Sequence, residues 1–279
     1  MIRTRIFAEN NYKSVYCNGK TMRFAIDPKQ PITELEYPEF MDVKITSKCE
    51  GKCPWCYMDS KPEDEHSVDP IGKIDRYFGS LTQNQRPFQV AIGGGEPTSH
   101  PQFIEILEKF EKLGICPNYT TNGMWVDSDN HENIISATKK LCGGVAVSCH
   151  PQLKKYWKRA SNAYHDAGIK LNFHIIISDK KSIDDFMEIY EEWHGKVDYF
   201  VLLPYGNQGR ATNKKIDWDY LCEVSPENSS DLAFGANFYP YLQKNPSRFD
   251  VSLYEPEIMS KFLDMSDMSI HKSSFSLNK

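Results

Sequence analysis

Six short β-rich segments recur along the chain at nearly constant spacing, and this spacing limits the fold more than any other feature. They begin at residues 41, 87, 115, 144, 170 and 197, so the first interval is 46 residues and the later four are 26 to 29. Each interval holds a segment of helical periodicity, for example residues 101–114 and 182–195. Strands that alternate with helices in this way predict a parallel sheet covered by helices.

Helix start and stop signals support the alternation. Pro101 suits a first helical turn, Gly114 suits the position after a helix end, and Ser182 with Asp185 three residues later suits an N-cap. Six such units can curl into an open barrel, with ligands at the carboxyl ends of the strands. The predicted fold class is therefore α/β, a partial (βα)6 TIM-like barrel.

The two ends of the chain depart from this pattern. Near the amino end, β-rich segments flank Asn18-Gly19, a pair that favours a type I′ turn, so a β-hairpin extension is expected over residues 1–40. The repeated units then account for residues 41–210. Residues 211–279 break the pattern, and we expect a small appendage there, irregular or rich in β-structure.

Charge and hydropathy narrow the classes of function. The net charge is −5 and the chain has no run of five or more Lys or Arg, so nucleic acid is not a favoured partner. No segment approaches the roughly 18 continuous apolar residues of a membrane span, and the amino end lacks a secretory signal. We expect a cytoplasmic protein whose eight cysteines are kept reduced.

Three of these cysteines directly follow the first predicted strand: Cys49, Cys53 and Cys56. Three thiolates within eight residues can close around one [4Fe–4S] cube and leave its fourth iron open to another ligand. Other readings exist. The CPWC segment alone suits thiol–disulfide exchange, a structural zinc would recruit a fourth ligand such as His66 or Cys142, and a simple iron–sulfur electron carrier also clusters its cysteines.

A second motif follows the second predicted strand, Gly93-Gly94-Gly95-Glu96-Pro97. Together, CxxxCxxC with Trp55 before the last cysteine and GGEP at the next strand end resemble the radical S-adenosylmethionine (SAM) superfamily. The resemblance covers roughly residues 41–210. It implies one [4Fe–4S] cluster on the three cysteines and SAM at the open iron.

The resemblance also implies which residues contact SAM. Backbone without side chains beside the acidic Glu96 can approach and hydrogen-bond the ammonium of SAM. Polar residues at later strand ends match family positions that contact its carboxylate, ribose or adenine, although His174 in an apolar strand also suits a simple core role. The expected SAM-binding residues are Trp55, Tyr57, Gly94, Gly95, Glu96, Pro97, Asn122, Ser148, His174 and Leu203. No catalytic side chain is assigned.

The implied activity is reductive cleavage of SAM to a 5′-deoxyadenosyl radical that abstracts hydrogen from a substrate. A peptide or protein is one substrate class, and a small metabolite or nucleotide is the other. An electron donor such as flavodoxin or ferredoxin is the expected partner. Similar members carry a carboxyl-terminal SPASM or twitch-like region for auxiliary clusters, but Cys222 is the only cysteine after Cys149 here, which argues against further clusters.

Overall fold

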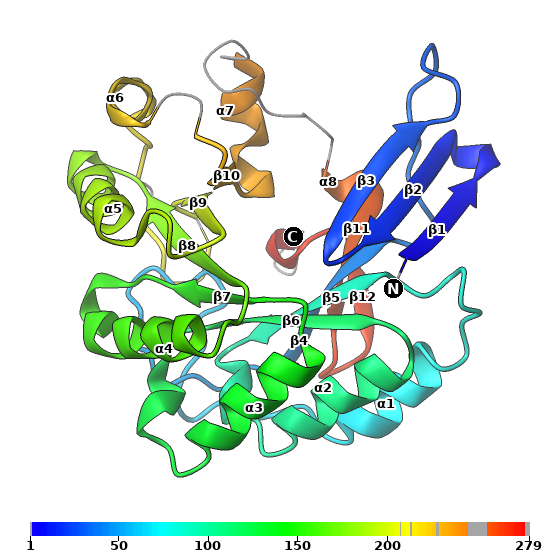
Figure 1. Ribbon diagram of the computed structural model, residues 1–279, viewed down its shortest axis with the longest axis horizontal. Helices are drawn as coiled ribbons and strands as arrows, with labels where there is room; N and C mark the ends of the chain where they lie inside the picture. Colours follow the sequence, from blue (N-terminus) through cyan, green and yellow to red (C-terminus); the bar gives the residue numbers. More distant parts are fainter. Residues whose placement is uncertain (1, 207, 213, 227–228, 245–255, 277–279) are drawn as a thin grey trace.

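The computed structural model describes residues 2–276 except 207, 213, 227–228 and 245–255. All six predicted strands lie side by side and parallel in one curved sheet (Figure 1). They are β4 (Phe40–Thr46), β5 (Gln89–Gly94), β6 (Cys116–Thr121), β7 (Val145–Ser148), β8 (Leu171–Ile177) and β9 (Tyr199–Pro204). The partial barrel predicted from the spacing is confirmed.

Helices connect these strands and lie outside the curved sheet, as Figure 1 shows. They are α1 (Pro70–Tyr77), α2 (Phe103–Lys112), α3 (His131–Leu141), α4 (Lys154–Asp166), α5 (Lys180–Trp193) and, after β9, α6 (Trp218–Val224). Short 3-10 helices are η1 (Ala8–Asn10), η2 (Pro97–Ser99), η3 (Met124–Asp127), η4 (Pro151–Leu153), η5 (Ala236–Phe238) and η6 (Ser274–Ser276).

Two details of the helix starts differ from the sequence expectation. Helix α5 begins two residues before Ser182, and its N-cap is Asp179, whose carboxylate accepts a hydrogen bond from the Ser182 amide at 3.2 Å. Pro101 precedes α2, which begins at Phe103. Gly114 does lie just past the end of α2 with φ 71°. The apolar period located both helices, but the choice among neighbouring polar residues depends on backbone angles.

Alternate residues of the strands have different surroundings. One set, which includes Val43 and Phe173, is fully buried against the helices. The other set, which includes Asp42 and His174, faces the inside of the barrel and is only partly buried. A Cβ placed on Gly93, in this inner set, would meet no atom within 4 Å. A closed eight-stranded barrel fills its interior with side chains, whereas here the inner face has free space beside Gly93.

The amino-terminal segment forms a three-stranded antiparallel sheet of β1 (Ile2–Phe7), β2 (Tyr12–Cys17) and β3 (Lys20–Ala25). The predicted hairpin is β2–β3, and Asn18 and Gly19 have the positive φ angles of 51° and 82° that its turn needs. Strand β1 was not predicted. The Arg3 guanidinium donates to the Gly114 carbonyl at 2.7 Å, which fastens the sheet near the amino ends of β5 and β6.

The carboxyl-terminal segment lengthens the barrel sheet at both edges. Strand β10 (Leu232–Phe234) pairs in parallel with β9, and β11 (Ser260–Asp264) pairs in parallel with β4 and antiparallel with β12 (Ser269–His271). Helices α7 (Tyr239–Lys244) and α8 (Pro256–Met259) belong to the same segment. Residues 211–279 thus supply strands to both edges of the sheet.

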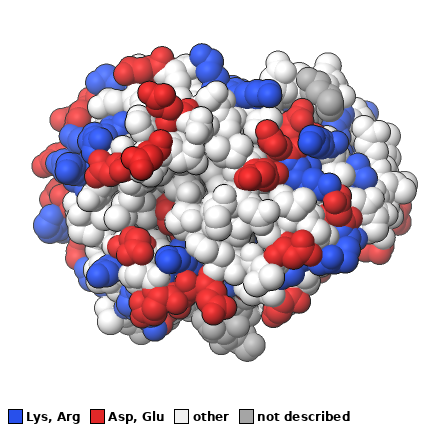
Figure 2. Space-filling model, turned by 90° about the horizontal axis from the view of Figure 1, so that it is seen from below, with Lys and Arg blue, Asp and Glu red and all other residues white. Residues whose placement is uncertain are grey.

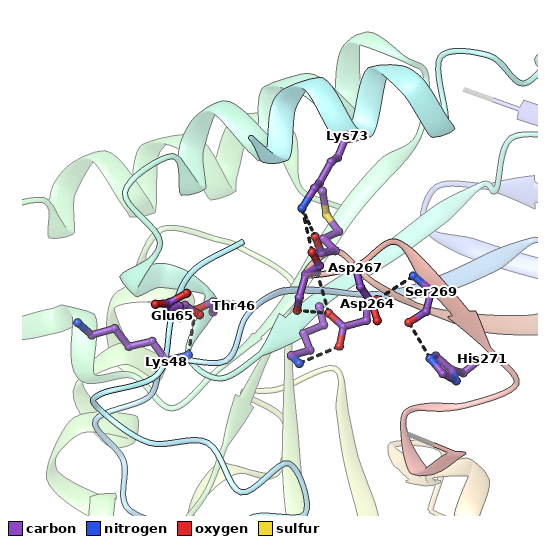
Figure 3. A network of polar contacts seen from close by, with 11 residues as sticks. Thr46, Lys48, Glu65, Lys73, Asp264, Asp267, Ser269 and His271 are labelled. Atoms are coloured by element: carbon purple, nitrogen blue, oxygen red, sulfur yellow. Dashed lines mark hydrogen bonds and ion pairs between the residues drawn. The ribbon is translucent and has the colours of Figure 1, made fainter. Parts of the chain in front are cut away.

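Polar contacts fasten the carboxyl end of β11 to the barrel, as Figure 3 shows. Lys44 of β4 pairs with Asp264 at 2.8 Å, and Lys73 of α1 donates to the Met265 carbonyl at 2.6 Å. Ser269 and His271 of β12 share a hydrogen bond of 2.8 Å. The far end of the chain is therefore held beside the strand that leads into the three cysteines.

Surface charges are mixed. In Figure 2, Lys and Arg side chains alternate with Asp and Glu around an uncharged central area. Several exposed pairs join neighbouring helices, including Lys158 of α4 with Glu192 of α5, and such pairs contribute little to stability. None of the described helices has the length and apolar character needed to cross a membrane.

Candidate functional site at the cysteine loop

The three cysteines lie on a long loop between β4 and α1, residues 47–69, which we call the cysteine loop. It doubles back on itself, because the Cys49 amide donates to the Lys61 carbonyl and the Ser67 amide donates to the Ile45 carbonyl, both at 3.0 Å. This excursion accounts for the greater length of the first interval. It keeps Cys49 beside the carboxyl end of β4.

The thiols of the cysteine loop are free and lie in a shared environment. Burial, with smaller contributions from the charges of Glu96, Cys53 and Cys56, raises the pKa of Cys49 to about 12. Burial and, to a lesser extent, the charge of Cys56 raise the pKa of Cys53 to about 11. A bound iron–sulfur cluster would supply the positive charge that stabilises these two cysteines as thiolates.

Nitrogen donors point at one of these sulfurs. The backbone nitrogen of Gly51 lies 3.4 Å from the Cys49 sulfur, and the side-chain amide nitrogen of Asn122 lies 3.7 Å from it. Hydrogen bonds to sulfur are among the features that stabilise thiolates in iron–sulfur sites. The donor set therefore fits a cluster held by three cysteines. Among the described residues, the three cysteines included, no three His, Cys, Asp or Glu side chains are already arranged around a single metal ion.

The glycines after β5 allow two backbones to meet. The Gly95 amide donates to the Thr46 carbonyl and the Glu96 amide donates to the Lys48 carbonyl, both at 2.8 Å. A Cβ on Gly95 would lie 2.0 Å from the Lys48 oxygen, and one on Gly94, where φ is 120°, would lie 2.1 Å from the Thr46 oxygen. No other residue fits at these positions without a shift of the backbone.

Glu96 is buried, and its carboxylate joins this turn to the end of β6. One oxygen accepts hydrogen bonds from the Thr98 hydroxyl at 2.7 Å and the Thr121 hydroxyl at 2.8 Å. The other oxygen accepts one from the backbone N–H of Asn122 at 2.7 Å. Burial raises the pKa of Glu96, and these hydrogen bonds oppose the rise. The second oxygen, with one bond, keeps a lone pair for a further donor.

Polar residues at the ends of β7 and β8 are also neighbours. Ser148 and His174 are register partners on the inner face. Burial lowers the pKa of His174 to about 4, and burial together with the charge of His174 lowers the pKa of His150 to about 4. Both imidazoles are therefore neutral at pH 7. The ring of His150 lies edge to face with Trp55 of the cysteine loop, 5.5 Å between centroids.

The other predicted residues, Pro97, Tyr57 and Leu203, lie in three different places. Pro97 begins η2, directly after Glu96, and is buried there. Tyr57 instead stacks on Phe275 at 4.5 Å, and its hydroxyl contacts Ser274. Leu203 pairs with Ile176 on β8. The structure thus places Glu96 and Asn122 with Cys49, Trp55 with His150, and Tyr57 with the carboxyl-terminal segment.

A cavity of about 450 Å³ lies between α4 and α5 and reaches the cysteine loop. Its lining at the strand ends comprises Trp55, His150, Ile176, Ser178 and Tyr205. Sequence reasoning did not assign His150, Ser178 or Tyr205 to the SAM site. A signal existed, because each follows a predicted strand directly, where the loops of an open α/β sheet carry ligand contacts.

Asp42 is a second residue that sequence reasoning missed. It lies on the inner face of β4, and in the described part of the chain its carboxylate has no hydrogen bond or ion pair. Burial raises its pKa to about 7. Burial is the main reason that the pKa of Tyr57 is raised to about 12, and the nearby charge of Asp42 contributes to the rise. Within the described residues, the inner face of the barrel therefore contains an acid without a partner, Asp42.

Comparison with known proteins decides the family. Residues 43–192, more than half of the chain, match the family model of the Radical SAM superfamily. The chain belongs to the radical SAM superfamily. Members of this superfamily are enzymes that use a [4Fe–4S] cluster and SAM, so these are the cofactors of this chain.

Solved structures agree on the fold. Streptococcus suis SuiB bound to its precursor peptide SuiA aligns with a TM-score of 0.69 and 17% identity, over 88% of this chain and 62% of SuiB. The enzyme anSMEcpe with bound AdoMet aligns with a TM-score of 0.59 and 14% identity, over 86% of this chain and 73% of that one. At these identities the likeness concerns the fold alone.

Curated relatives match shorter segments. PqqA peptide cyclase of Methylorubrum extorquens is 27% identical over 96 residues, 34% of this chain and 24% of the cyclase. The subtilosin biosynthesis protein AlbA of Bacillus subtilis is 28% identical over 118 residues, 41% of this chain and 25% of AlbA. The matched segment thus spans about a quarter of each of these relatives.

Proposed function

We propose that this radical SAM enzyme binds its [4Fe–4S] cluster through Cys49, Cys53 and Cys56 and modifies a peptide substrate. The observation that supports the metal site is the set of three free thiols on one loop, with two N–H donors directed at the Cys49 sulfur. When bound, the cluster and SAM supply a radical that removes a hydrogen atom from the substrate. The division into residues 1–40, 41–210 and 211–279 stays a prediction.

The chain's own residues would bind and orient SAM. Glu96 has a lone pair available for the SAM ammonium, and the neighbouring glycines leave backbone without side chains beside it. The cavity between α4 and α5 has an apolar floor of Trp55 and Ile176, with Ser178 and Tyr205 as polar neighbours. We assign this cavity to the adenosine part. Ser148 and His174, neutral at pH 7, would serve as uncharged hydrogen-bonding groups.

A peptide substrate is supported by several relatives named for peptides. SuiB is bound to a precursor peptide, PqqA peptide cyclase is named for a peptide, and AlbA is named for biosynthesis of the bacteriocin subtilosin. The open barrel interior would hold the substrate. An electron donor such as flavodoxin or ferredoxin is proposed as the partner that reduces the cluster.

A nucleotide substrate is the second candidate. The S-adenosylmethionine-dependent nucleotide dehydratase of Flammeovirga pacifica is 24% identical over 182 residues, 57% of this chain and 61% of the dehydratase. This match covers a larger share of both proteins than the peptide-cyclase matches do. It is the observation that favours the alternative.

The test begins with anaerobically reconstituted protein. It should bind about four irons and four sulfides per chain and form 5′-deoxyadenosine from SAM with dithionite. The combined substitution C49A/C53A/C56A should abolish both. The matched control C116A/C142A/C222A removes three cysteines elsewhere and should retain the iron. Equal iron loss in the two triple variants would contradict the assigned ligands.

The substrate class is tested separately by isotope transfer. Candidate deuterated peptides and deuterated nucleotides would be incubated with the clustered enzyme, and deuterium would be sought in 5′-deoxyadenosine. Transfer from a peptide supports the main proposal. Transfer from a nucleotide and from no peptide would replace it with the alternative.

A further inference from the structure

The segment after β9 folds over the cysteine loop, although the two are about 150 residues apart in sequence. The Arg210 amide donates to the Cys56 carbonyl at 2.9 Å. Gly209, with φ 61°, lies so close that a Cβ there would be 2.3 Å from the Cys56 oxygen and 2.6 Å from the Tyr57 oxygen. The contact is thus made backbone to backbone.

The side chain of Arg210 reaches across the same loop. Its Nε donates to the Cys53 carbonyl at 3.0 Å, and one terminal nitrogen pairs with Asp59 at 2.8 Å. One residue therefore contacts the loop at Cys53, Cys56 and Asp59. The guanidinium side chain is 28% exposed, so the surrounding protein partly shields it from water.

The guanidinium of Arg210 also places a positive charge beside two of the proposed ligands, because Arg210 is bonded to the backbone carbonyls of Cys53 and Cys56. A nearby cation attracts any negative charge that the thiolates and the cluster gain.

We propose that Arg210 is a positioning residue that holds the cysteine loop in its cluster-binding shape and raises the reduction potential of the bound cluster. The inference rests on the proposed function, because it takes Cys49, Cys53 and Cys56 as the ligands. It goes beyond that function by assigning a role to a residue that is neither a ligand nor a SAM contact.

The sign of the effect follows from charge. One-electron reduction makes the cluster and its thiolates more negative, and a nearby cation stabilises that reduced form. Removing the cation should make the cluster harder to reduce. Asp59, the partner of Arg210, carries the opposite charge, so its neutralisation should make reduction easier. A role limited to loop shape predicts no such opposite pair of changes.

Geometry and charge can be separated by substitution. R210Q removes the charge and the fork of donors, whereas R210K keeps a positive charge but cannot bond Cys53 and Asp59 together in the same way. D59N keeps Arg210 and removes its counter-charge. The control is R159Q, because Arg159 also forms an exposed pair, with Asp127, and its bonds are to residues outside the cysteine loop.

Three quantities are measured on the reconstituted full chain: iron content, the midpoint potential from redox titration followed by electron paramagnetic resonance, and the rate of iron loss to a chelator. R210Q should shift the midpoint to more negative values, and D59N should shift it less and in the opposite direction. R210K should stay near the wild type in potential. R210Q and R210K should lose iron on the order of tenfold faster, and R159Q should match the wild type throughout.

The outcomes distinguish the inference from the function on which it rests. If the wild type binds no cluster, the ligand assignment fails. If the wild type binds four irons and R210Q shows the same midpoint potential and the same rate of iron loss as the wild type, the role of Arg210 is refuted. If R210Q cannot hold a cluster at all, D59N and R210K decide: a wild-type potential in D59N together with wild-type iron loss in R210K would overturn the proposal.

Discussion

Two parts of the barrel differ in how tightly they pack. On the packed side, the backbones of β4 and β5 meet directly at their carboxyl ends, with Gly95 against Lys48 and Gly94 against Thr46. The open side is the inner face of the same two strands, where a Cβ on Gly93 would meet no atom within 4 Å and Asp42 is only partly buried. The packed side has little freedom to change shape, which suits a fixed cluster site. The open side has space, which suits ligands that enter and leave.

The two glycines Gly95 and Gly93 test this contrast with the largest expected effect. G95A would place a methyl group 2.0 Å from a backbone oxygen, so the free energy of unfolding should fall by about 3 kcal/mol. G93A should be tolerated or slightly stabilising, because its Cβ would meet nothing within 4 Å. Urea unfolding of both variants measures the difference. Equal costs would show that the packing contrast is wrong.

Glu96 tests how far the packed side depends on one buried carboxylate. E96Q keeps the shape of the side chain, but its amide NH2 group replaces a carboxylate oxygen. That group can only donate, and it would face Thr98, Thr121 or Asn122, which already donate to this site. Unfolding free energy should fall by about 1–3 kcal/mol. SAM affinity should fall about tenfold through the lost charge, measured by equilibrium dialysis.

The control is T98V, which removes one hydroxyl donor to Glu96 and leaves the carboxylate in place. It should cost about 1 kcal/mol and change SAM affinity little. An E96Q variant with wild-type SAM affinity would remove Glu96 from the SAM site. That result would leave the role of Glu96 in joining β5 to β6 intact.

Asp42 tests the open side through the pH dependence of stability. Its folded pKa of about 7 lies above its ordinary value of 3.8. The fold therefore favours the protonated acid, and this contribution to stability is present below pH 3.8 and is lost as the pH rises to 7. D42N should thus gain stability relative to wild type as the pH rises from 4 to 7.

Thermal unfolding across that pH range measures the change. The control is D267N, because hydrogen bonds from Ser269 lower the pKa of Asp267 and its neutralisation should not stabilise the protein at pH 8. A D42N variant that is no more stable than wild type at pH 8 would mean that water in the interior solvates the Asp42 carboxylate fully.

The sequence determined the barrel because its information is local and repeated. Apolar period and punctuation located the six strands, and adjacent residues carried the cysteine and GGEP motifs. The turn at Asn18 and Gly19 was equally readable, since positive φ angles restrict which residues can occupy it. Whether the predicted ligands bind cluster and SAM stays a prediction.

Only the tertiary structure decided which distant segments meet. Strands β10 and β11 join opposite edges of the sheet, and Arg210 reaches Cys53 and Asp59 from the far side of the barrel. Such contacts leave no local pattern, because a three-residue strand or a lone arginine has no periodicity to detect. Asp42 shows the same limit, since an acid in a β-rich run becomes distinctive only when burial leaves it without a partner. Motif and period are properties of the chain, whereas closure of the sheet and pairing of buried charge are properties of the packed fold.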